Sequence, residues 1–427
     1  MIKNSLENLD RIQMSSARLE GIVNISGAKN SVLRLMAATL LTDESVVIRN
    51  YPDTLLDAIV HKDMLATLGK SCTVEDESLI VSENQKLGKI LEWDGRSIRN
   101  TLLILGALVS RFGYGAVPLP GGCSIGGGDG DRAYDLHVQL LTSLGAKVWE
   151  EGGYLHAKSK SSRLKGADIH LPIRSTGATE NGIISGVLAT GVTRIWNPHV
   201  RPEVQDLISM LRSMGATISV YGQEHIEIVG VESLRGTTHK VISDNVEALT
   251  WLVGASVTSG EVEIKNFPFA DLEVPLVYLR ESGARLYTHK SSLIVKSSNC
   301  YPLELSTGPY PGINSDMQPI LAVFAAKSKG RSKFVDLRFP GRYGYASELN
   351  KMGLKSHTDG NMLIIDGGQK LVGAEVTALD LRAGISLALA SLFAEGETTI
   401  RDAWQITRGY DRFFEKMDAL GAKVKIS

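Results

Sequence analysis

Six glycines at nearly regular spacing constrain the fold of this chain more than any other feature. Each one follows a helix-like segment and precedes a short strand-like run, as in MLATLGKSCTV, LLTSLGAKVWE and KMDALGAKVKI. They recur every 68 to 76 residues, at Gly69, Gly145, Gly215, Gly283, Gly353 and Gly421. Self-similarity at a fixed period is typical of repeat architectures. The sequence therefore predicts six copies of one structural unit.

A second recurring segment alternates with the first and consists of a helix of small apolar residues, a turn and a strand. Three of its six occurrences read GVLATGVTRIWN, GASVTSGEVEIKN and LFAEGETTIRD. Helices that are apolar all round are packed on several sides, and each glycine stands where a helix end or turn needs a left-handed residue. We expect two helices and several strands per unit, and therefore an α/β fold. The units are longer than the roughly 30 residues of a (β/α)₈ barrel unit, which disfavours that fold.

Length and charge limit the class of protein. A chain of 427 residues exceeds what one hydrophobic core usually organises, so we expect two domains. The formal net charge of -1 provides no overall field for nucleic acid or an anionic membrane. Three scattered cysteines do not suit a disulfide framework or a paired-ligand zinc site. No signal peptide or membrane-spanning run is recognisable, so we expect a cytoplasmic protein.

The second repeat is longer than the others, and its extra residues fall between Gly115 and Gly145. This stretch contains PGGCSIGGGDGDRAYDLH. A glycine-rich insertion in a regular repeat is typical of a functional loop. Its Cys123 is therefore a candidate reactive thiol, and the alternative is a small buried hydrophobic residue.

Lys29 in SGAKNS precedes an apolar helix, where its ammonium would add to the positive helix N-terminus and favour an anion. The P-loop spacing is absent, and a solvated surface lysine is the alternative. Arginine suits carboxylate and phosphate because its planar fork donates two parallel hydrogen bonds. Candidates beside glycine or aspartate are Arg99, Arg342, Arg382 and Arg408. Asp316 and Asp380 lie beside apolar runs and are equally compatible with helix caps.

Taken together, SGAKNS, PGGCSIG followed by DLH, RSTGAT, SDMQ, DLRA and RGY resemble the enolpyruvyl transferase family, in particular the UDP-N-acetylglucosamine 1-carboxyvinyltransferases. The match runs from about Gly21 to the C-terminus. The resemblance implies an inverse α/β barrel of two domains, each with three βαβαββ units, and an active site in the cleft between them. It implies one domain at residues 22–242 and a second at residues 1–21 and 243–427.

The resemblance also implies roles for individual residues. Lys29, Arg132 and Arg408 match cations that bind the phosphate of phosphoenolpyruvate. Arg342 and Arg382 match residues that hold its carboxylate. The acceptor contacts implied by the resemblance are Asn30, Arg99, Asp135, Leu136, Ser175, Thr176, Asp316 and Arg338, with Arg99 near both substrates.

Asp316 matches the candidate general base, and Cys123 matches the proton donor to the methylene carbon and the target of fosfomycin-type epoxides. The implied reaction protonates the enol, adds the acceptor oxygen to give a ketal and then expels phosphate. These steps demand no metal or organic cofactor. The implied partners are phosphoenolpyruvate and a uridine nucleotide sugar.

Several positions depart from the family pattern. Ile173 stands where a lysine is usual, Arg338 replaces a small apolar residue, Gln405 replaces a histidine, and the segment 244–250 is divergent. We interpret these changes as clustering on the acceptor side. Three functions stay open: transfer to the 3-hydroxyl of UDP-N-acetylglucosamine for peptidoglycan synthesis, transfer to another nucleotide such as UMP in nucleoside-antibiotic biosynthesis, and an inactive nucleotide-sugar-binding protein.

Overall fold

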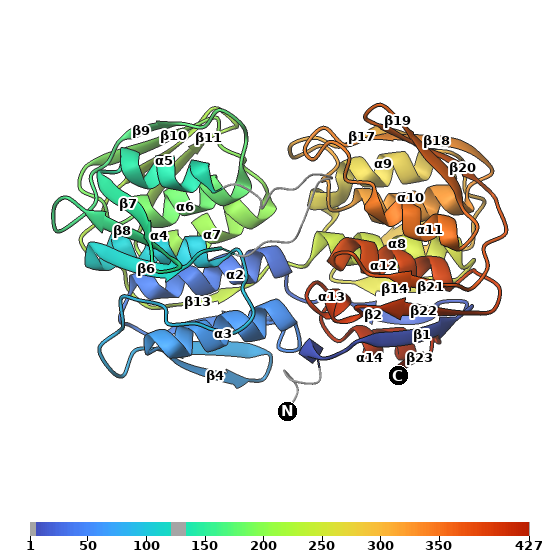
Figure 1. Ribbon diagram of the computed structural model, residues 1–427, viewed down its shortest axis with the longest axis horizontal. Coiled ribbons are helices and arrows are strands. Elements are labelled where there is room, and N and C mark those ends of the chain that lie inside the picture. The colour runs from blue at the N-terminus through green and yellow to red at the C-terminus, as the bar shows by residue number, and fades with distance from the viewer. Residues whose placement is uncertain (1–5, 121–133, 427) are drawn as a thin grey trace.

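Two lobes of similar construction lie side by side in the computed structural model, which describes residues 6–120 and 134–426 (Figure 1). Each lobe has its own hydrophobic core. The core of the first lobe draws on residues 32–241, and that of the second on residues 9–25 and 246–422. The second lobe is thus built from both ends of the chain.

The first lobe contains three repeats. The first comprises α2 (Lys29–Ala38), η1 (Thr39–Leu41), β3 (Val46–Arg49), α3 (Leu56–Leu68), β4 (Ser71–Glu75) and β5 (Ser78–Ser82). The second comprises α4 (Thr101–Phe112), β6 (Tyr114–Pro118), α5 (Asp135–Ser143), β7 (Ala146–Glu151) and β8 (Tyr154–Ser159). The third comprises β9 (Asp168–His170), α6 (Thr176–Gly186), β10 (Val192–Trp196), α7 (Pro202–Ser213), β11 (Thr217–Tyr221) and β12 (His225–Val229), and β13 (Thr237–Lys240) follows. The third repeat shows the expected βαβαββ order.

The second lobe also contains three repeats, and strands from the N-terminus complete the first and the last of them. Its N-terminal strands are β1 (Arg11–Ser15) and β2 (Glu20–Asn24). Its first repeat comprises α8 (Asn245–Val257), β14 (Glu261–Lys265), η2 (Phe269–Leu272), α9 (Glu273–Glu281), β15 (Arg285–His289) and β16 (Ser292–Lys296). The next comprises β17 (Glu304–Ser306), α10 (Gln318–Lys327), β18 (Gly330–Val335), α11 (Gly344–Lys351), β19 (Lys355–Asp359) and β20 (Met362–Gly367). The last comprises β21 (Glu375–Thr377), α12 (Leu381–Ser391), β22 (Glu397–Arg401), α13 (Trp404–Thr407), α14 (Phe413–Ala419) and β23 (Val424–Ile426).

The chain crosses between the lobes twice, and a strand beside each crossing completes a sheet. β2 pairs in parallel with β14 of the second lobe, whereas β13 pairs in parallel with β3 of the first. β2 thus supplies the missing first strand of the repeat that begins at α8, and β13 supplies that of the repeat that begins at α2. Because β2 extends to Asn24, the first crossing lies a few residues after the boundary predicted at residue 22.

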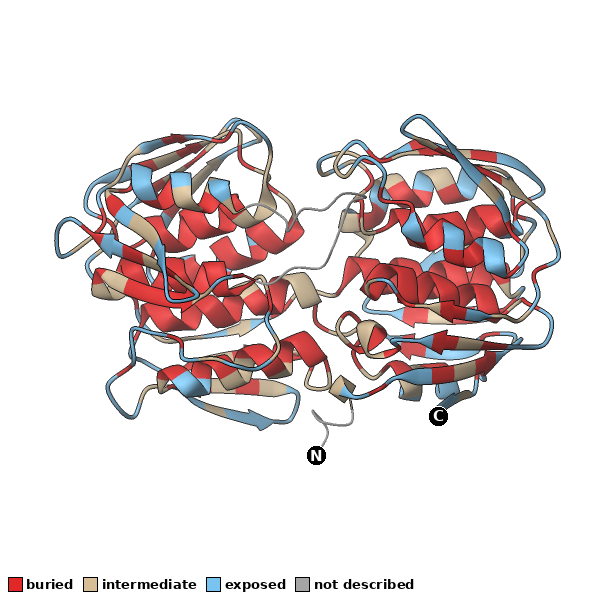
Figure 2. Cartoon of the chain, in the orientation of Figure 1, coloured by how far each residue is buried: buried red, intermediate tan, exposed pale blue. Residues whose placement is uncertain are grey.

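The small-residue helices form the interior of each lobe, and the sheets surround them (Figure 2). In the first lobe these inner helices are α2, α4 and α6, and in the second α8, α10 and α12. Small side chains permit their close approach: a Cβ at Gly106 on α4 would lie 1.9 Å from the Asn181 amide oxygen on α6. All six repeat glycines have φ between +86° and +107°, as the sequence predicted for left-handed helix ends.

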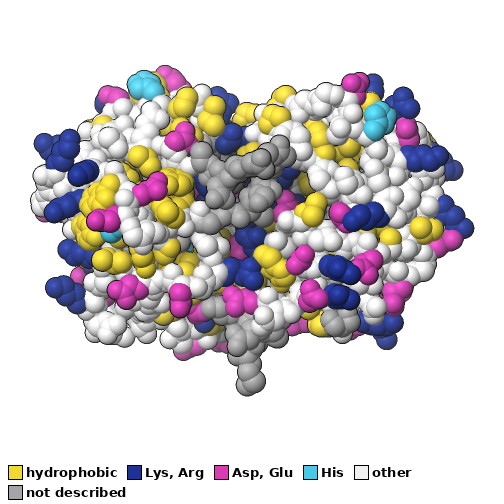
Figure 3. Space-filling view, viewed as in Figure 1, with side chains coloured by type: hydrophobic (Ala, Val, Ile, Leu, Met, Phe, Trp, Pro, Cys, Tyr) yellow, Lys and Arg dark blue, Asp and Glu magenta, His cyan; other side chains and the backbone are white. Residues whose placement is uncertain are grey.

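Acidic and basic side chains are interspersed over the face of both lobes seen in Figure 3, consistent with the small net charge. No helix within residues 6–120 and 134–426 has the length and apolar character needed to cross a membrane.

Candidate active site

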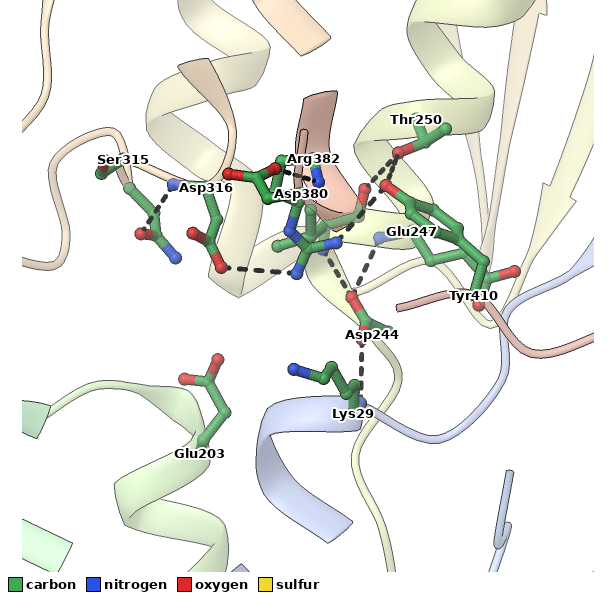
Figure 4. Close-up of polar contacts among 12 residues, drawn as sticks. Lys29, Glu203, Asp244, Glu247, Thr250, Ser315, Asp316, Asp380, Arg382 and Tyr410 are labelled. Carbon is green, nitrogen blue, oxygen red and sulfur yellow. Dashed lines mark hydrogen bonds and ion pairs between the residues drawn. The ribbon is translucent and has the colours of Figure 1, made fainter. Parts of the chain in front are cut away.

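The predicted cations and carboxylates lie where inner helices of the two lobes begin. Lys29 is the first residue of α2, Asp380 is the N-cap of α12, and Asp316 shortly precedes α10. Helix N-termini carry a partial positive charge and expose free N–H groups, so they favour anions. In Figure 4, Lys29, Asp316 and Arg382 point toward one space, and Glu203 faces them from α7 of the first lobe.

Asp244 joins two of these helix starts. Its Oδ1 accepts hydrogen bonds from the backbone N–H groups of Val246 and Glu247, at 2.8 and 2.9 Å, and so caps α8. Its Oδ2 accepts from the backbone N–H of Lys29 at 2.9 Å. One carboxylate therefore fixes helices of both lobes at the crossing between them.

Two of the predicted phosphate-binding cations share one buried carboxylate. The Nζ of Lys29 lies 3.2 Å from Asp57 Oδ2, and Arg408 Nε donates to Asp57 Oδ1 at 3.1 Å. Arg408 comes from the second lobe and Asp57 from α3 of the first. Gln405 Oε1 accepts from Arg408 Nη1 at 3.0 Å. Gln405 thus contacts one of the cations predicted to bind phosphate, so this departure from the family pattern lies beside Arg408 and not among the predicted acceptor contacts.

The pKa values reflect how tightly these groups are gathered. Burial lowers the pKa of Lys29, Asp57 acts in the opposite direction, and Arg408 and Arg382 lower it further. Burial alone would raise the pKa of Asp57, but Arg408 and Lys29 outweigh this effect and hold it below its usual range. The cations of this group therefore lie close enough to repel one another, with Asp57 between two of them.

A second cluster surrounds Asp316. Its Oδ1 lies 2.8 Å from Arg342 Nη1 and its Oδ2 lies 3.4 Å from Arg382 Nη2. Ser315 Oγ accepts from Arg342 at 3.1 Å, and Asp380 Oδ2 lies 3.6 Å from Arg342 Nη2. Burial alone would raise the pKa of Asp316, but Arg382 and Arg342 hold it well below its usual range. Asp316 is therefore ionised in this arrangement.

The two arginines of this cluster keep further donors for an anion. The Nε atoms of Arg342 and Arg382 are buried and have no hydrogen-bond partner within residues 6–120 and 134–426. Both side chains are almost fully buried. Since a buried donor without a partner costs free energy, such atoms indicate a place for a ligand.

The first lobe adds a cation that the sequence analysis did not identify. Arg201 makes two hydrogen bonds of 2.8 Å to Glu203. Burial alone would lower the pKa of Arg201, but Glu203 and Asp316 raise it. The charge of Asp316, on the second lobe, thus acts on Arg201 of the first lobe. Its sequence context, VRPEV, contains no glycine or aspartate, so the rule used to select arginines missed it.

The predicted acceptor residues are more dispersed. Ser175 is the N-cap of α6 and accepts from the backbone N–H of Ala178 at 3.4 Å, and Thr176 begins that helix. The guanidinium of Arg338 lies 5.0 Å from the centre of the Phe339 ring. The remaining described positions are half-buried or exposed: Asn30 on α2, Arg99 before α4, and Asp135 and Leu136 at the start of α5. Cys123 and Arg132 lie outside the described residues.

Comparisons with known sequences give the same family throughout. The family model for EPSP synthase (3-phosphoshikimate 1-carboxyvinyltransferase) matches residues 14–417. A UDP-N-acetylglucosamine 1-carboxyvinyltransferase from Novosphingobium aromaticivorans is 37% identical, covering 96% of each chain. UDP-N-acetylglucosamine 1-carboxyvinyltransferase 1 from Caldanaerobacter subterraneus subsp. tengcongensis is 38% identical, covering 96% of this chain and 97% of the relative.

Two solved structures share the fold. The enolpyruvyl transferase NikO from Streptomyces tendae superposes with a TM-score of 0.87 at 26% identity, covering 97% of this chain and 98% of NikO. EPSP synthase from Acinetobacter baumannii superposes with a TM-score of 0.76 at 19% identity, covering 98% of this chain and all of the other. The two-lobed, sixfold architecture is therefore the enolpyruvyl transferase fold, as the sequence predicted.

Proposed function

The chain belongs to the EPSP synthase family of carboxyvinyltransferases, and from this membership we propose that it transfers the enolpyruvyl group of phosphoenolpyruvate to the 3-hydroxyl of UDP-N-acetylglucosamine, releasing phosphate. In this role it makes a peptidoglycan precursor in the cytoplasm and is a target of fosfomycin-type epoxides at Cys123. The observation that carries the proposal is that Lys29, which shares Asp57 with Arg408, points toward the same space as Arg382 and Asp316 (Figure 4).

The donor site accounts for both charged ends of phosphoenolpyruvate. Lys29 and Arg408 receive its phosphate, and Arg342 and Arg382 receive its carboxylate. Bound substrate therefore competes with two carboxylates of the protein, Asp57 at the first pair and Asp316 at the second. At the first pair, the phosphate carries more charge and more acceptor oxygens than the carboxylate of Asp57, which favours the exchange there.

This exchange gives Asp316 its role as a base. While both arginines contact it, its lowered pKa makes it a poor proton acceptor. When the substrate carboxylate takes the arginines, Asp316 loses the charges that depress its pKa. It then accepts the proton of the acceptor hydroxyl as the new C–O bond forms at C2 of phosphoenolpyruvate.

The remaining steps balance without another reactant. The methylene carbon gains a proton, for which Cys123 is the proposed donor, and a ketal results. The bond between C2 and the phosphate oxygen then breaks and phosphate leaves with the electron pair, taking up the proton held by Asp316. The methyl group returns a proton to the Cys123 thiolate, which restores the double bond. Lys29 and Arg408 stabilise the charge that develops on the leaving phosphate.

The acceptor is UDP-N-acetylglucosamine because relatives at 37–38% identity over almost the full chain carry that name. The proposed acceptor contacts are Asn30, Arg99, Asp135, Leu136, Ser175, Thr176, Asp316 and Arg338. The alternative acceptor is another uridine nucleotide such as UMP. The structural match to the enolpyruvyl transferase NikO, at lower identity, is the reason to include this nucleotide in the test.

The test is phosphate release from phosphoenolpyruvate with a panel of uridine nucleotides. Release with UDP-N-acetylglucosamine, and not with UMP, is the expected result. Phosphate release only with a different nucleotide would identify that nucleotide as the acceptor. Absence of release with every nucleotide would indicate a protein that binds nucleotide sugars without catalysis.

Thiol alkylation is a companion test. Burial raises the pKa of Cys72 and of Cys300 to about 11, so both react slowly near neutral pH. We therefore expect iodoacetamide to abolish phosphate release through Cys123. Full activity of the alkylated protein would contradict the assignment of Cys123 as proton donor.

A further inference from the structure

His199 connects the two lobes beside the proposed acceptor site. It follows β10, and its Nδ1 lies 2.9 Å from Thr176 Oγ1 at the start of α6. Its Nε2 lies 3.0 Å from the backbone N of Tyr310, which belongs to the second lobe. The backbone N–H of His199 donates to Thr179 Oγ1 at 3.0 Å. His199 is therefore held through both its ring and its main chain.

The partners of His199 determine its tautomer. The backbone N–H of Tyr310 is only a donor, so Nε2 must be an unprotonated acceptor. In the neutral ring the proton is therefore on Nδ1 and is donated to Thr176 Oγ1. Since Thr176 Oγ1 already accepts this hydrogen bond, its own hydroxyl proton is available to another acceptor.

The surroundings keep the imidazole neutral. Burial lowers the pKa of His199 to about 4, with further lowering by Arg201, Arg338 and Arg174. Arg201 and Arg174 belong to the first lobe and Arg338 to the second. At neutral pH both hydrogen bonds of the ring are therefore maintained.

The Tyr310 end of this connection leads to the candidate base. The backbone N–H of Gly308 donates to the carbonyl of Ile313 at 2.9 Å, which closes the loop containing Tyr310. Asp316 follows this loop, and its own N–H donates to Asn314 Oδ1 at 3.2 Å. His199 and Tyr310 line one pocket together with Asn314.

We propose that His199 is a positioning residue that prepares the Thr176 hydroxyl to donate to an oxygen of the acceptor and ties this turn to the loop leading to Asp316. An acceptor held at Thr176 is thereby oriented relative to the base of the other lobe. Orientation of reacting groups is a large part of catalysis, so a small displacement here affects the reaction. The inference rests on the proposed function, because it takes Thr176 as an acceptor contact.

A double-mutant cycle tests this role. Thr176→Val removes the hydroxyl with little change of volume, and His199→Gln and His199→Asn each fail to reproduce both ring contacts. Each single substitution is expected to raise the KM for the acceptor about tenfold, the weight of one hydrogen bond, and to leave the KM for phosphoenolpyruvate within about twofold. His199→Gln in the Thr176→Val background should add less than about threefold, because both changes remove the same interaction.

The inference is overturned if the two effects multiply to about 100-fold, or if both His199 variants keep the acceptor KM of the wild type. His357→Gln is the matched control, since His357 is exposed on β19. Thermal unfolding establishes that each variant is folded. If His199→Gln is not folded, His199→Asn replaces it in the double-mutant cycle. Absence of turnover in the wild type with any nucleotide would refute the proposed function instead, which separates the two failures.

Discussion

The donor and acceptor sides of the proposed site are built on different principles. On the donor side, Lys29 and Arg408 share Asp57, and Arg342 and Arg382 share Asp316. Every one of these cations already has a carboxylate of the protein beside it. On the acceptor side, the two proposed contacts at the start of α6, Ser175 and Thr176, are neutral and make neutral hydrogen bonds.

This difference implies different recognition of the two proposed substrates. A cluster of buried cations would be unstable without counter-charge, and here Asp57 and Asp316 supply it. In the proposed function, the donor substrate replaces these carboxylates. Neutral hydrogen bonds depend on geometry instead of charge. Single substitutions on the acceptor side should therefore change which nucleotide binds. Two departures from the family pattern differ in the same way. Gln405 still accepts a hydrogen bond from Arg408, whereas Ile173 places no cation where the family usually has a lysine.

Removal of a protein carboxylate from the donor side should have the largest effect. Asp57→Asn leaves Lys29 and Arg408 without counter-charge, and we expect the free energy of unfolding to fall by about 3 kcal/mol. Inorganic phosphate should restore more stability to this variant than to the wild type. Urea denaturation with and without phosphate measures both. In the control Asp53→Asn, which loses a half-exposed pair with Arg412, the loss should stay below about 1 kcal/mol, and equal losses would contradict the comparison.

Next in size is the loss of catalytic groups. Lys29→Ala and Asp316→Ala should each reduce turnover at least about 100-fold, the typical weight of an acid or base group. The measurement is the rate of phosphate release at saturating substrates, and Lys86→Ala, at an exposed position, is the control. Near-normal release by either variant would refute its assigned role.

The arginines around Asp316 predict a smaller, pH-dependent effect. Because its pKa is lowered in the folded protein, Asp316 stabilises the fold above its unfolded pKa of about 4, and this contribution is lost as the pH falls through the folded pKa. We expect Asp316→Asn to lose about 2 kcal/mol at neutral pH and to show a shallower decline below pH 4. Urea denaturation at stepped pH values measures this. Identical slopes in variant and wild type would show that the arginines do not act on Asp316.

The acceptor side should give the smallest effect. Ile173 is 47% exposed, so Ile173→Lys adds a cation without disturbing the core. We expect it to lower the KM for UDP-N-acetylglucosamine about threefold to fivefold, as suits an exposed charge pair, with Ile173→Gln unchanged. No change with the lysine would mean that this position lies away from the diphosphate of the acceptor.

Local rules in the sequence were sufficient for the repeat. Gly69 and Gly421 lie far apart in the chain, yet both occupy the left-handed region, because a helix end imposes this conformation wherever it occurs. The same period predicted six units and the buried small-residue helices.

Pairings between distant segments could not be predicted in this way. Asp57 gave no signal, because its partner Arg408 is 351 positions away. His199 was missed for the same reason, because its contact with Tyr310 depends on how the lobes face each other. The position of Gln405 beside Arg408 follows from an i,i+3 spacing, which is a signal present in the sequence.

The two crossings set an order of assembly for the nascent chain. β1 and β2 are synthesised first, but β2 pairs with β14 and β1 with β22 and β23, all of which follow the whole first lobe. The first lobe has its complete set of strands once β13 has emerged. Since domains tend to fold as they leave the ribosome, the first lobe folds while β1 and β2 still lack partners. The second lobe therefore closes only when translation is nearly finished.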